Sequence, residues 1–214
     1  MICISLGDMS FEECRNHVLS EDFVELRLDL LQLSTDQLEQ VLTMPGKKIV
    51  TCRQGDYSDD ERMGFFLTAL NKEVDYIDLE LEMPGKMREK IISRARSKGC
   101  RVIISHHNYN FTASVGELRQ MVQACRAAGA DVVKLACQVN EPADNIRLLS
   151  LCDEKEQLVI VGMGPLGVIT RVAGPLLGAL FTYAAPKKEM ETATGQLTKD
   201  ALLQIYGLIG ARFD

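Results

Sequence analysis

The chain has 214 residues, and its 30 acidic residues outnumber the 24 basic ones, which gives a net charge of −6. This balance argues against broad nucleic-acid binding, which requires a cationic surface, but it allows a local cationic pocket. Hydrophobic residues make up 46% of the chain, as in soluble globular proteins. No run of about 18 apolar residues is present, so no membrane span is expected. The first residues lack the basic start and long apolar core of a signal peptide.

The cysteines favour a reducing compartment. There are seven, an odd number, and no C-x-x-C pair occurs among them. Several, such as Cys52, lie inside apolar runs, which is typical of buried reduced thiols in a cytoplasmic protein. The three histidines show no clustered ligand spacing, so no metal site is expected.

Eight short segments rich in Val, Ile and Leu are predicted to be strands. In chain order they cover 2–6, 23–29, 47–53, 76–82, 101–107, 132–138, 158–163 and 180–184. Helical patterns lie between them, and the first begins with a capping box of Ser10 and Glu13. A second helix is predicted to begin after Ser34 and to end before Pro45-Gly46. Two more begin after Pro84 and Ser114 and end at Gly99 and Gly129. The last three are predicted at about 141–154, 167–178 and 198–209.

Strands that alternate with helices pair in parallel through right-handed crossovers. Eight such βα units close into a (β/α)8 TIM barrel, with eight parallel strands inside and the helices outside. The alternative is an open doubly wound sheet, but no G-x-G-x-x-G fingerprint follows the first strand. No linker or low-complexity stretch divides the chain, so residues 1–214 are predicted to form a single barrel domain.

Charged residues within the predicted strands indicate where the chemistry lies. Barrel enzymes carry their reacting groups at the carboxyl ends of strands, and side chains at i and i+2 share a face. Pointed inward, these faces would form a pocket with a lysine, a histidine, two arginines and several carboxylates, while His106 points the other way and is predicted to be structural. The faces hold Glu25, Arg27 and Asp29; Thr51 and Arg53; Asp78, Glu80 and Glu82; Ser105 and His107; and Lys134 with Val132 and Ala136.

Lys134 is the residue whose position most favours function. A lysine inside an apolar strand is costly unless it is neutral or paired. A neutral amine beside a histidine can attack a ketone to form an imine, whose protonated form is an electron sink that acidifies the neighbouring C–H bond. The histidine transfers protons, and no metal or cofactor is needed. Taken alone, Glu25 and Arg27 could equally well be structural, and Cys137 is predicted to be a packed thiol.

Five segments carry ordered motifs that run from the second strand to the loop after the eighth. They are 25–29 (E-L-R-L-D), 105–109 (S-H-H-N-Y), 130–134 (A-D-V-V-K), 163–171 (M-G-P-L-G-V-I-T-R) and 192–196 (T-A-T-G-Q). In the same order they resemble the E-x-R-x-D, S-x-H-[DN]-[FY], A-D-x-x-K, M-G-x-x-G-x-x-[ST]-R and S-A-P-G-Q motifs of the type I 3-dehydroquinate dehydratase family. Each motif is weak alone, but the ordered set is specific.

The resemblance implies a hydro-lyase that converts 3-dehydroquinate to 3-dehydroshikimate and water in the shikimate pathway. It implies a Schiff base between Lys134 and the C3 ketone, with His107 as general acid and base. Arg171 would clamp the substrate carboxylate, a role suited to its planar fork. The other implied contacts are Glu25, Arg27 and Arg53 to ring hydroxyls, Thr192 and Gln196 on a lid-like loop, and Met163 against the ring.

Three departures from the family pattern concern the same site. The family commonly has Glu or Gln followed by Gly-Gly after the third-strand arginine, but here the loop 54–56 (Q-G-D) is shorter. The residue that orients His107 is therefore left open, with Asp56 as one candidate. The remaining departures are threonine in place of serine at Thr192 and of proline at Thr194, and valine in place of a frequent methionine at Val161.

Two other functions stay open. A class I aldolase-type lyase would also use a Schiff-base lysine on the sixth strand, but Arg171 and the five ordered motifs favour the dehydratase. A catalytically inactive barrel could serve as a binding module, but the intact pair of Lys134 and His107 argues against it. By analogy with the family, the chain is expected to be a homodimer that binds 3-dehydroquinate as its substrate. The cysteines favour the cytoplasm.

Overall fold

The computed structural model describes residues 1–152 and 157–211, and within them eight parallel strands form one sheet in the order β7-β6-β5-β4-β3-β2-β1-β8. Just before the last strand, the backbone N of Leu180 donates to Leu158 O of the other edge strand at 2.8 Å, so the sheet is a nearly closed barrel. The strands are β1 (Ile2–Leu6), β2 (Phe23–Arg27), β3 (Lys47–Thr51), β4 (Tyr76–Glu80), β5 (Arg101–Asn108), β6 (Val132–Gln138), β7 (Leu158–Met163) and β8 (Thr182–Ala184).

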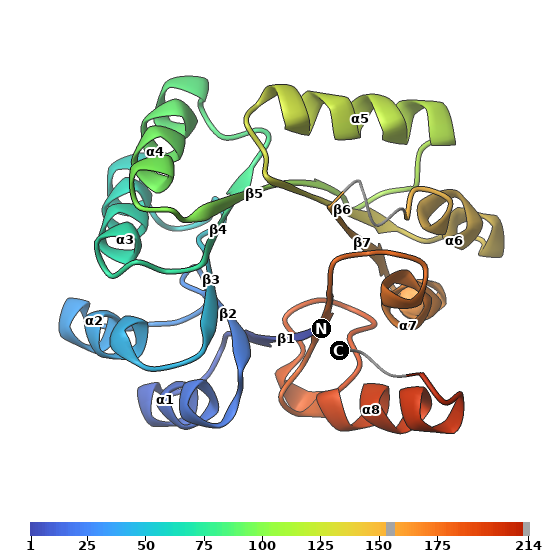
Figure 1. Cartoon of the computed structure of the whole chain (residues 1–214), viewed down its shortest axis with the longest axis horizontal. Helices are drawn as coiled ribbons and strands as arrows, with labels where there is room; N and C mark the ends of the chain where they lie inside the picture. The colour runs from blue at the N-terminus through green and yellow to red at the C-terminus, as the bar shows by residue number, and fades with distance from the viewer. Residues whose placement is uncertain (153–156, 212–214) are drawn as a thin grey trace.

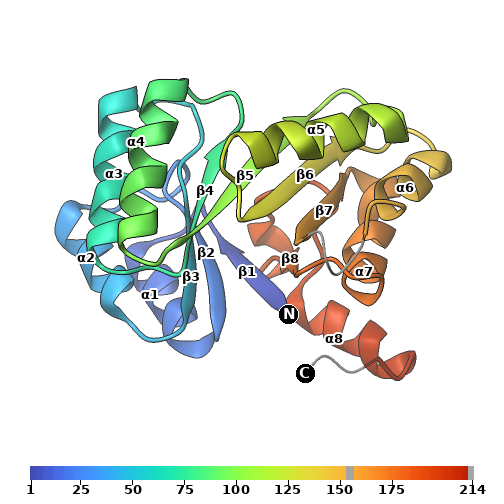
Figure 2. The ribbon, with the colours of Figure 1, turned by 45° about the horizontal axis from the view of Figure 1, so that its top comes forward.

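Helices surround the strands, as Figure 1 shows, and α3 and α4 lie side by side in both Figure 1 and Figure 2. Each follows the strand of the same number, which is the predicted (β/α)8 order. None in the described residues is long and apolar enough to cross a membrane. They are α1 (Phe11–Ser20), α2 (Thr35–Thr43), α3 (Asp59–Asn71), α4 (Gly85–Ser97), α5 (Val115–Ala127), α6 (Pro142–Leu149), α7 (Val168–Leu176) and α8 (Lys199–Leu208).

Capping boxes determine where several helices begin. At α1, the Ser10 hydroxyl accepts from Glu13 N and the Glu13 carboxylate accepts from Ser10 N, as predicted. The same arrangement begins α2, α3 and α5. The sequence analysis gives no bounds for α3, although Ser58 and Glu61 carry the same signal at its start.

The predicted ends of several elements are wrong by two or more residues. β2, β3 and β4 each end two residues early, because the chain turns where the strand meets the barrel mouth: both Leu30 N and Leu31 N donate to Arg27 O at 2.9 Å. β8 begins two residues later than predicted. α6 ends at Leu149 and is capped by Ser150, and residues 153 and 154 of its predicted range lie outside the described residues.

The apolar core has two parts. The larger cluster lies between the barrel and the helices, and the smaller one consists of side chains that point into the barrel. In the smaller cluster, the ring centroids of Phe23 and Phe181 are 5.1 Å apart, and Tyr76 lies 5.9 Å from Phe23. The Tyr183 ring lies 5.3 Å from Phe181 and beside the polar residues described below. The pocket of the barrel therefore has an aromatic floor.

Candidate active site

A cavity of about 260 Å³ lies at the carboxyl ends of the strands, where barrel enzymes place their reacting groups. Its wall brings together all of the predicted site residues, which are Glu25, Arg27, Arg53, His107, Lys134, Met163, Arg171, Thr192 and Gln196. The other lining residues are Ser5, Tyr109, Ala136, Gln138, Val161, Tyr183, Ala193 and Thr194.

Lys134 of β6 points into the barrel and is 7% exposed. Its Nζ lies 3.0 Å from Asp78 Oδ2 and 3.4 Å from Glu25 Oε1. It also lies 4.1 Å from the centroid of the Tyr183 ring. Of the two states that the apolar strand allows for this lysine, neutral or paired, the structure shows the paired one.

Glu25 of β2 is held by hydroxyl groups on both sides. Ser5 Oγ donates to Glu25 Oε2 at 2.6 Å, and Thr51 Oγ1 donates to Glu25 Oε1 at 2.9 Å. Burial raises the pKa of the Glu25 carboxyl, but the charges of Lys134 and Arg27 and the bond from Ser5 outweigh it and leave the pKa below its ordinary value. Glu25 is therefore a carboxylate that can hold a cation.

Asp78 of β4 connects Lys134 to Arg53. The two Nη atoms of Arg53 donate to the two oxygens of Asp78 at 2.9 and 2.7 Å, and Arg53 Nη1 also donates to Ser105 Oγ at 2.8 Å. Although burial works in the opposite direction, Arg53 and Lys134 hold the pKa of Asp78 well below its ordinary range. Two buried cations and two buried carboxylates thus compensate one another beneath the cavity.

His107 of β5 is a neutral imidazole. Burial, followed by the charges of Arg53 and Lys134, lowers its pKa to about 2. Its Nδ1 is buried and has no hydrogen-bond partner among the described residues, and its ring stacks on Tyr109 with centroids 5.9 Å apart. Asp56 is exposed and does not supply the missing partner. His107 can therefore accept a proton from a group in the cavity.

His106 faces away from the cavity, as predicted. Its Nδ1 lies 2.5 Å from Glu82 Oε1, and its side chain lines a separate hollow against α5 together with Cys137. Cys137 is buried, and burial raises the pKa of its thiol to about 11. The prediction of a packed thiol is therefore confirmed.

The two remaining arginines of the cavity differ in their partners. Arg27 donates to both oxygens of Asp29, at 3.0 and 2.6 Å. Arg171, near the start of α7, is 1% exposed and forms no ion pair, and its Nε has no partner among the described residues. It makes one weak contact, from Nη2 to Thr194 O at 3.4 Å. Burial lowers the pKa of Arg171 to about 10, and an anion bound beside this guanidinium would stabilise its charge.

The loop 185–198, between β8 and α8, covers one side of the cavity. Thr192 Oγ1 donates to Ser5 Oγ at 2.7 Å, and Thr192 N donates to Gln196 Oε1 at 2.9 Å. Gly195 has a φ of +77°, and a Cβ there would lie 2.5 Å from Gly164 O. Glycine is therefore required where this loop packs on the turn after β7.

Three side chains that were predicted to point into the pocket do not line the cavity. Asp29 pairs with Arg27 but does not line the cavity, and neither Glu80 nor Glu82 lines it. The alternation fails for the two glutamates because β4 ends at Glu80, where Met83 N donates back to Glu80 O. The Glu80 carboxylate instead accepts from Arg62 Nη2 and from the backbone N of Gln54; the Glu82 carboxylate pairs with His106.

The sequence analysis missed three polar lining residues, Ser5, Gln138 and Tyr183. Ser5 and Tyr183 belong to strands that otherwise read as apolar, so no charge marked them. The register could have found Ser5, because it lies directly opposite Glu25 in the β1–β2 pair. Tyr183 is opposite Cys3, which carries no such signal.

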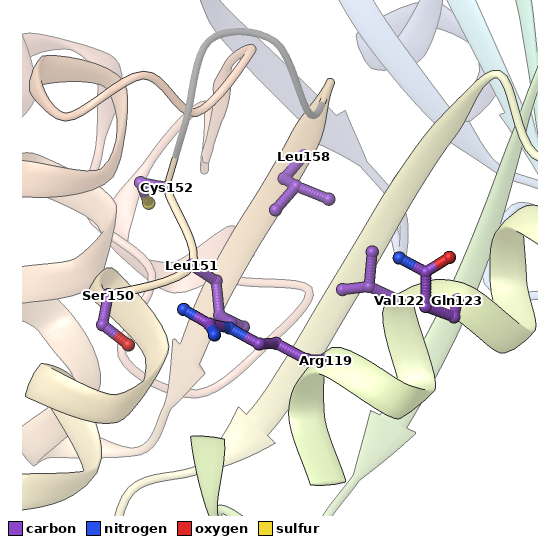
Figure 3. Close-up of a pocket in the computed structure, with 7 residues that line it drawn as sticks. All are labelled: Arg119, Val122, Gln123, Ser150, Leu151, Cys152 and Leu158. Carbon is purple, nitrogen blue, oxygen red and sulfur yellow. The ribbon is translucent and has the colours of Figure 1, made fainter. Parts of the chain in front are cut away.

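A second cavity, of about 290 Å³, lies between α5 and the segment that follows α6. Arg119 extends from α5 toward Ser150 and Leu151, and Leu158 of β7 also lines this cavity (Figure 3). Among the described residues, neither a lysine nor a histidine lines this cavity. In the described part of the chain, no three His, Cys, Asp or Glu side chains gather as they would around a metal ion.

The fold and the polar cavity define the class of this protein, a (β/α)8-barrel enzyme with a polar cavity at the carboxyl ends of its strands. Residues 2–212 match the family profile of type I 3-dehydroquinase. The chain belongs to the type I 3-dehydroquinase family.

Similar proteins agree with this assignment. A 3-dehydroquinate dehydratase of Dehalococcoides mccartyi is 33% identical over 192 residues, which cover 86% of this chain and 84% of the relative. One of Pyrococcus abyssi is 32% identical over 197 residues, 89% of each chain. The crystal structure of the Aquifex aeolicus 3-dehydroquinate dehydratase superposes with a TM-score of 0.80 at 26% identity, covering 97% of this chain and 98% of that one.

Proposed function

We propose that this chain dehydrates 3-dehydroquinate to 3-dehydroshikimate and water through a Schiff base on Lys134. The observation that carries the proposal is the arrangement of one amine and one neutral imidazole on the wall of the same cavity. An amine supplies the electron sink, and a neutral imidazole supplies the base. Family membership supports the same reaction.

In the proposed reaction, the ammonium of Lys134 transfers a proton to the neutral imidazole of His107. Because burial keeps the pKa of His107 low, this transfer is uphill, and it is completed only as the amine attacks the substrate. The amine adds to the C3 ketone to give a carbinolamine, and His107 passes its proton to the carbinolamine hydroxyl, which leaves as water to give a protonated imine. His107 is neutral again at this point. The imine draws electrons from the neighbouring C–H bond, His107 accepts that proton, and then delivers a proton to the departing hydroxyl group. Water finally hydrolyses the imine and frees Lys134. Asp78 and Glu25 balance the positive nitrogen throughout.

Arg171 is proposed to bind the carboxylate of the substrate. Its guanidinium is buried against the cavity and forms no ion pair with a described residue, which is costly until an anion binds. A bidentate pair with a carboxylate would satisfy the Nε atom that now has no partner.

The remaining contacts are assigned by position in the cavity wall. Glu25, Arg27 and Arg53 are proposed to hold ring hydroxyls, although Arg53 also directs both Nη atoms at Asp78. The thioether of Met163 is proposed to pack on the ring. Thr192 and Gln196 are proposed to close the loop 185–198 over the substrate.

One assay distinguishes the dehydratase from the aldolase-type lyase and from the binding module. 3-Dehydroshikimate is a conjugated enone, so its formation from 3-dehydroquinate raises ultraviolet absorbance. A dehydratase gives this increase, an aldolase-type lyase forms a borohydride-trapped adduct without it, and a binding module gives neither. Lys134→Arg is the matched control, because it keeps a cation beside Asp78 and Glu25 but cannot form an imine. Absence of enone with the wild-type chain would refute the proposal.

We also propose that residues 1–214 act as one catalytic domain in a cytoplasmic homodimer. Seven free cysteines, six of them buried, suit a reducing compartment. Neighbouring helices α7 and α8 expose large apolar side chains that suit an interface between copies, namely Ile169, Leu176, Leu203 and Leu208. Light scattering should give a mass near twice 23.8 kDa, and a monomer would contradict the dimer.

A further inference from the structure

The ring of Tyr183 is a part of the cavity wall that the proposed chemistry leaves without a role. Tyr183 lies in β8 and is 3% exposed, and the Lys134 ammonium lies 4.1 Å from the centroid of its ring. This distance is well inside the range of about 6 Å over which a cation is attracted to an aromatic face. Both groups are buried, which strengthens the attraction because water does not screen it.

We propose that the face of Tyr183 stabilises positive charge on Lys134 Nζ and thereby keeps the imine of the reaction protonated. This inference rests on the proposed Schiff-base function. When water leaves the adduct, it takes the C–O electron pair, and the nitrogen lone pair forms the C=N bond. The nitrogen then carries the positive charge that makes it an electron sink.

The ring supplies what the two carboxylates cannot. Asp78 and Glu25 attract the ammonium at 3.0 and 3.4 Å, but a protonated imine keeps only one N–H and can donate to only one of these two carboxylates. An aromatic face attracts the same charge and has no basic atom directed at it. Tyr183 therefore favours the protonated imine without offering a route to the neutral one.

The hydroxyl of Tyr183 does not take part in this arrangement. Its Oη is buried and has no hydrogen-bond partner among the described residues. Burial, together with the charges of Glu25 and Asp78, raises the pKa of Tyr183 well above its ordinary value, so the phenol is neutral. The ring alone accounts for the contact, and Tyr183→Phe should preserve it.

Phe181 is a matched control for loss of an aromatic ring. It lies two residues before Tyr183 in the same core cluster, is 1% exposed, and its ring centroid is 5.3 Å from that of Tyr183. It packs on Phe23 and Tyr76 in the floor and does not line the cavity. Phe181→Leu therefore opens a similar space in the barrel without removing the ring beside Lys134.

The first experiment needs no 3-dehydroquinate. Trace acetic anhydride at pH 7 acylates free amines, and peptide mapping gives the yield at Lys134 relative to the other lysines. Tyr183→Leu should raise that yield about three- to tenfold, because loss of a cation–π contact favours the free amine. Tyr183→Phe and Phe181→Leu should stay within about twofold of the wild type. Equal yields in Tyr183→Leu and Phe181→Leu would overturn the inference.

If Tyr183→Leu does not fold, fluorinated phenylalanines at position 183 test the same contact. Each added fluorine weakens the negative face of the ring while its shape is nearly kept. The yield at Lys134 should rise in steps with the number of fluorines, whereas a flat series would show that the ring acts only by packing.

The second experiment uses the substrate. The fraction of Lys134 trapped by borohydride with 3-dehydroquinate should fall in Tyr183→Leu, and the loss should grow as the pH rises. A loss of the same size at every pH would contradict a role in keeping the imine protonated. If the wild-type chain forms no adduct, the proposed function fails, and the acylation yields still decide whether the ring stabilises the ammonium.

Discussion

Lys134 Nζ lies 3.0 Å from Asp78 Oδ2, and this buried ion pair joins β6 to β4 beneath the cavity. Asp78 also receives both Nη atoms of Arg53, so the position of the lysine depends on a charge network and not on its own strand alone. Removing one partner of such a pair typically costs about 3–5 kcal/mol. The amine is therefore held in place as an ammonium, and a base must release it before it can attack.

Substitution of the two adjacent histidines should affect turnover to very different extents. They lie on opposite faces of β5, and His107 alone faces the cavity. His107→Ala should lower kcat about 10²–10⁴-fold, the range that acid–base catalysis supplies. His106→Ala should keep kcat within a few-fold of the wild type, because it loses only a contact with Glu82 outside the cavity. Steady-state assays of both folded variants test this, and the reverse order would show that the register of β5 is off by one.

The low pKa of His107 predicts how stability changes with pH. Burial and the neighbouring cations lower this pKa to about 2 in the folded chain, whereas an unfolded histidine titrates near about 6.5. Below pH 6.5 the unfolded state therefore binds a proton that the folded state does not. The His107 contribution to the free energy of unfolding falls as pH falls, by up to about 1.4 kcal/mol per pH unit.

His107→Asn should remove this contribution, so its free energy of unfolding should depend less steeply on pH between 6.5 and 4.5. Urea unfolding at three pH values measures the slopes. Parallel slopes for His107→Asn and the wild type would show that the imidazole is accessible to protons in the folded chain.

Arg171→Lys should weaken substrate binding. A compact ammonium cannot reproduce the bidentate contact with a carboxylate, so we expect KM to rise and kcat/KM to fall by about 1.5–3 kcal/mol in activation free energy. Arg119→Lys, in the second cavity, is the matched control and should leave both constants unchanged. Unaltered kcat/KM in Arg171→Lys would assign the arginine a structural role.

Gly195→Ala should disturb the loop 185–198. Its φ of +77° is unfavourable for alanine by about 1–2 kcal/mol, and the added Cβ would lie 2.5 Å from Gly164 O. The loop would have to move away from the turn after β7, so KM should rise about tenfold or more. Gly207→Ala, in α8 with open space around it, should keep the wild-type KM and melt at the same or a higher temperature. A wild-type KM for Gly195→Ala would show that the loop does not help to hold the substrate.

Much of the barrel could be predicted because each βα unit carries local signals. Apolar runs and capping residues such as Ser10 and Glu13 act over a few residues, and alternation placed Lys134 and His107 on the inward face. The ends of β2 and β4 could not be predicted in this way, because a strand ends where its neighbour stops pairing. The start of α3 was missed although its capping box is present.

The partners of the charged groups depend on the closure of the barrel. Asp78 meets Lys134 across 56 residues of sequence, and Glu25 meets it across 109. No pattern within one strand shows which inward carboxylate will reach which cation. The aromatic ring beside Lys134 comes from β8, which the sequence shows as a short apolar run. Family resemblance indicated the reacting residues, but their contacts required the three-dimensional structure.

The covalent bond between Lys134 and the substrate can be tested directly. Borohydride is added to the chain with 3-dehydroquinate, the protein is digested, and the modified peptide is identified by mass spectrometry. We expect one adduct, located on Lys134, that is absent without substrate and absent in Lys134→Arg. An adduct on another lysine, or turnover of 3-dehydroquinate without any adduct, would contradict it.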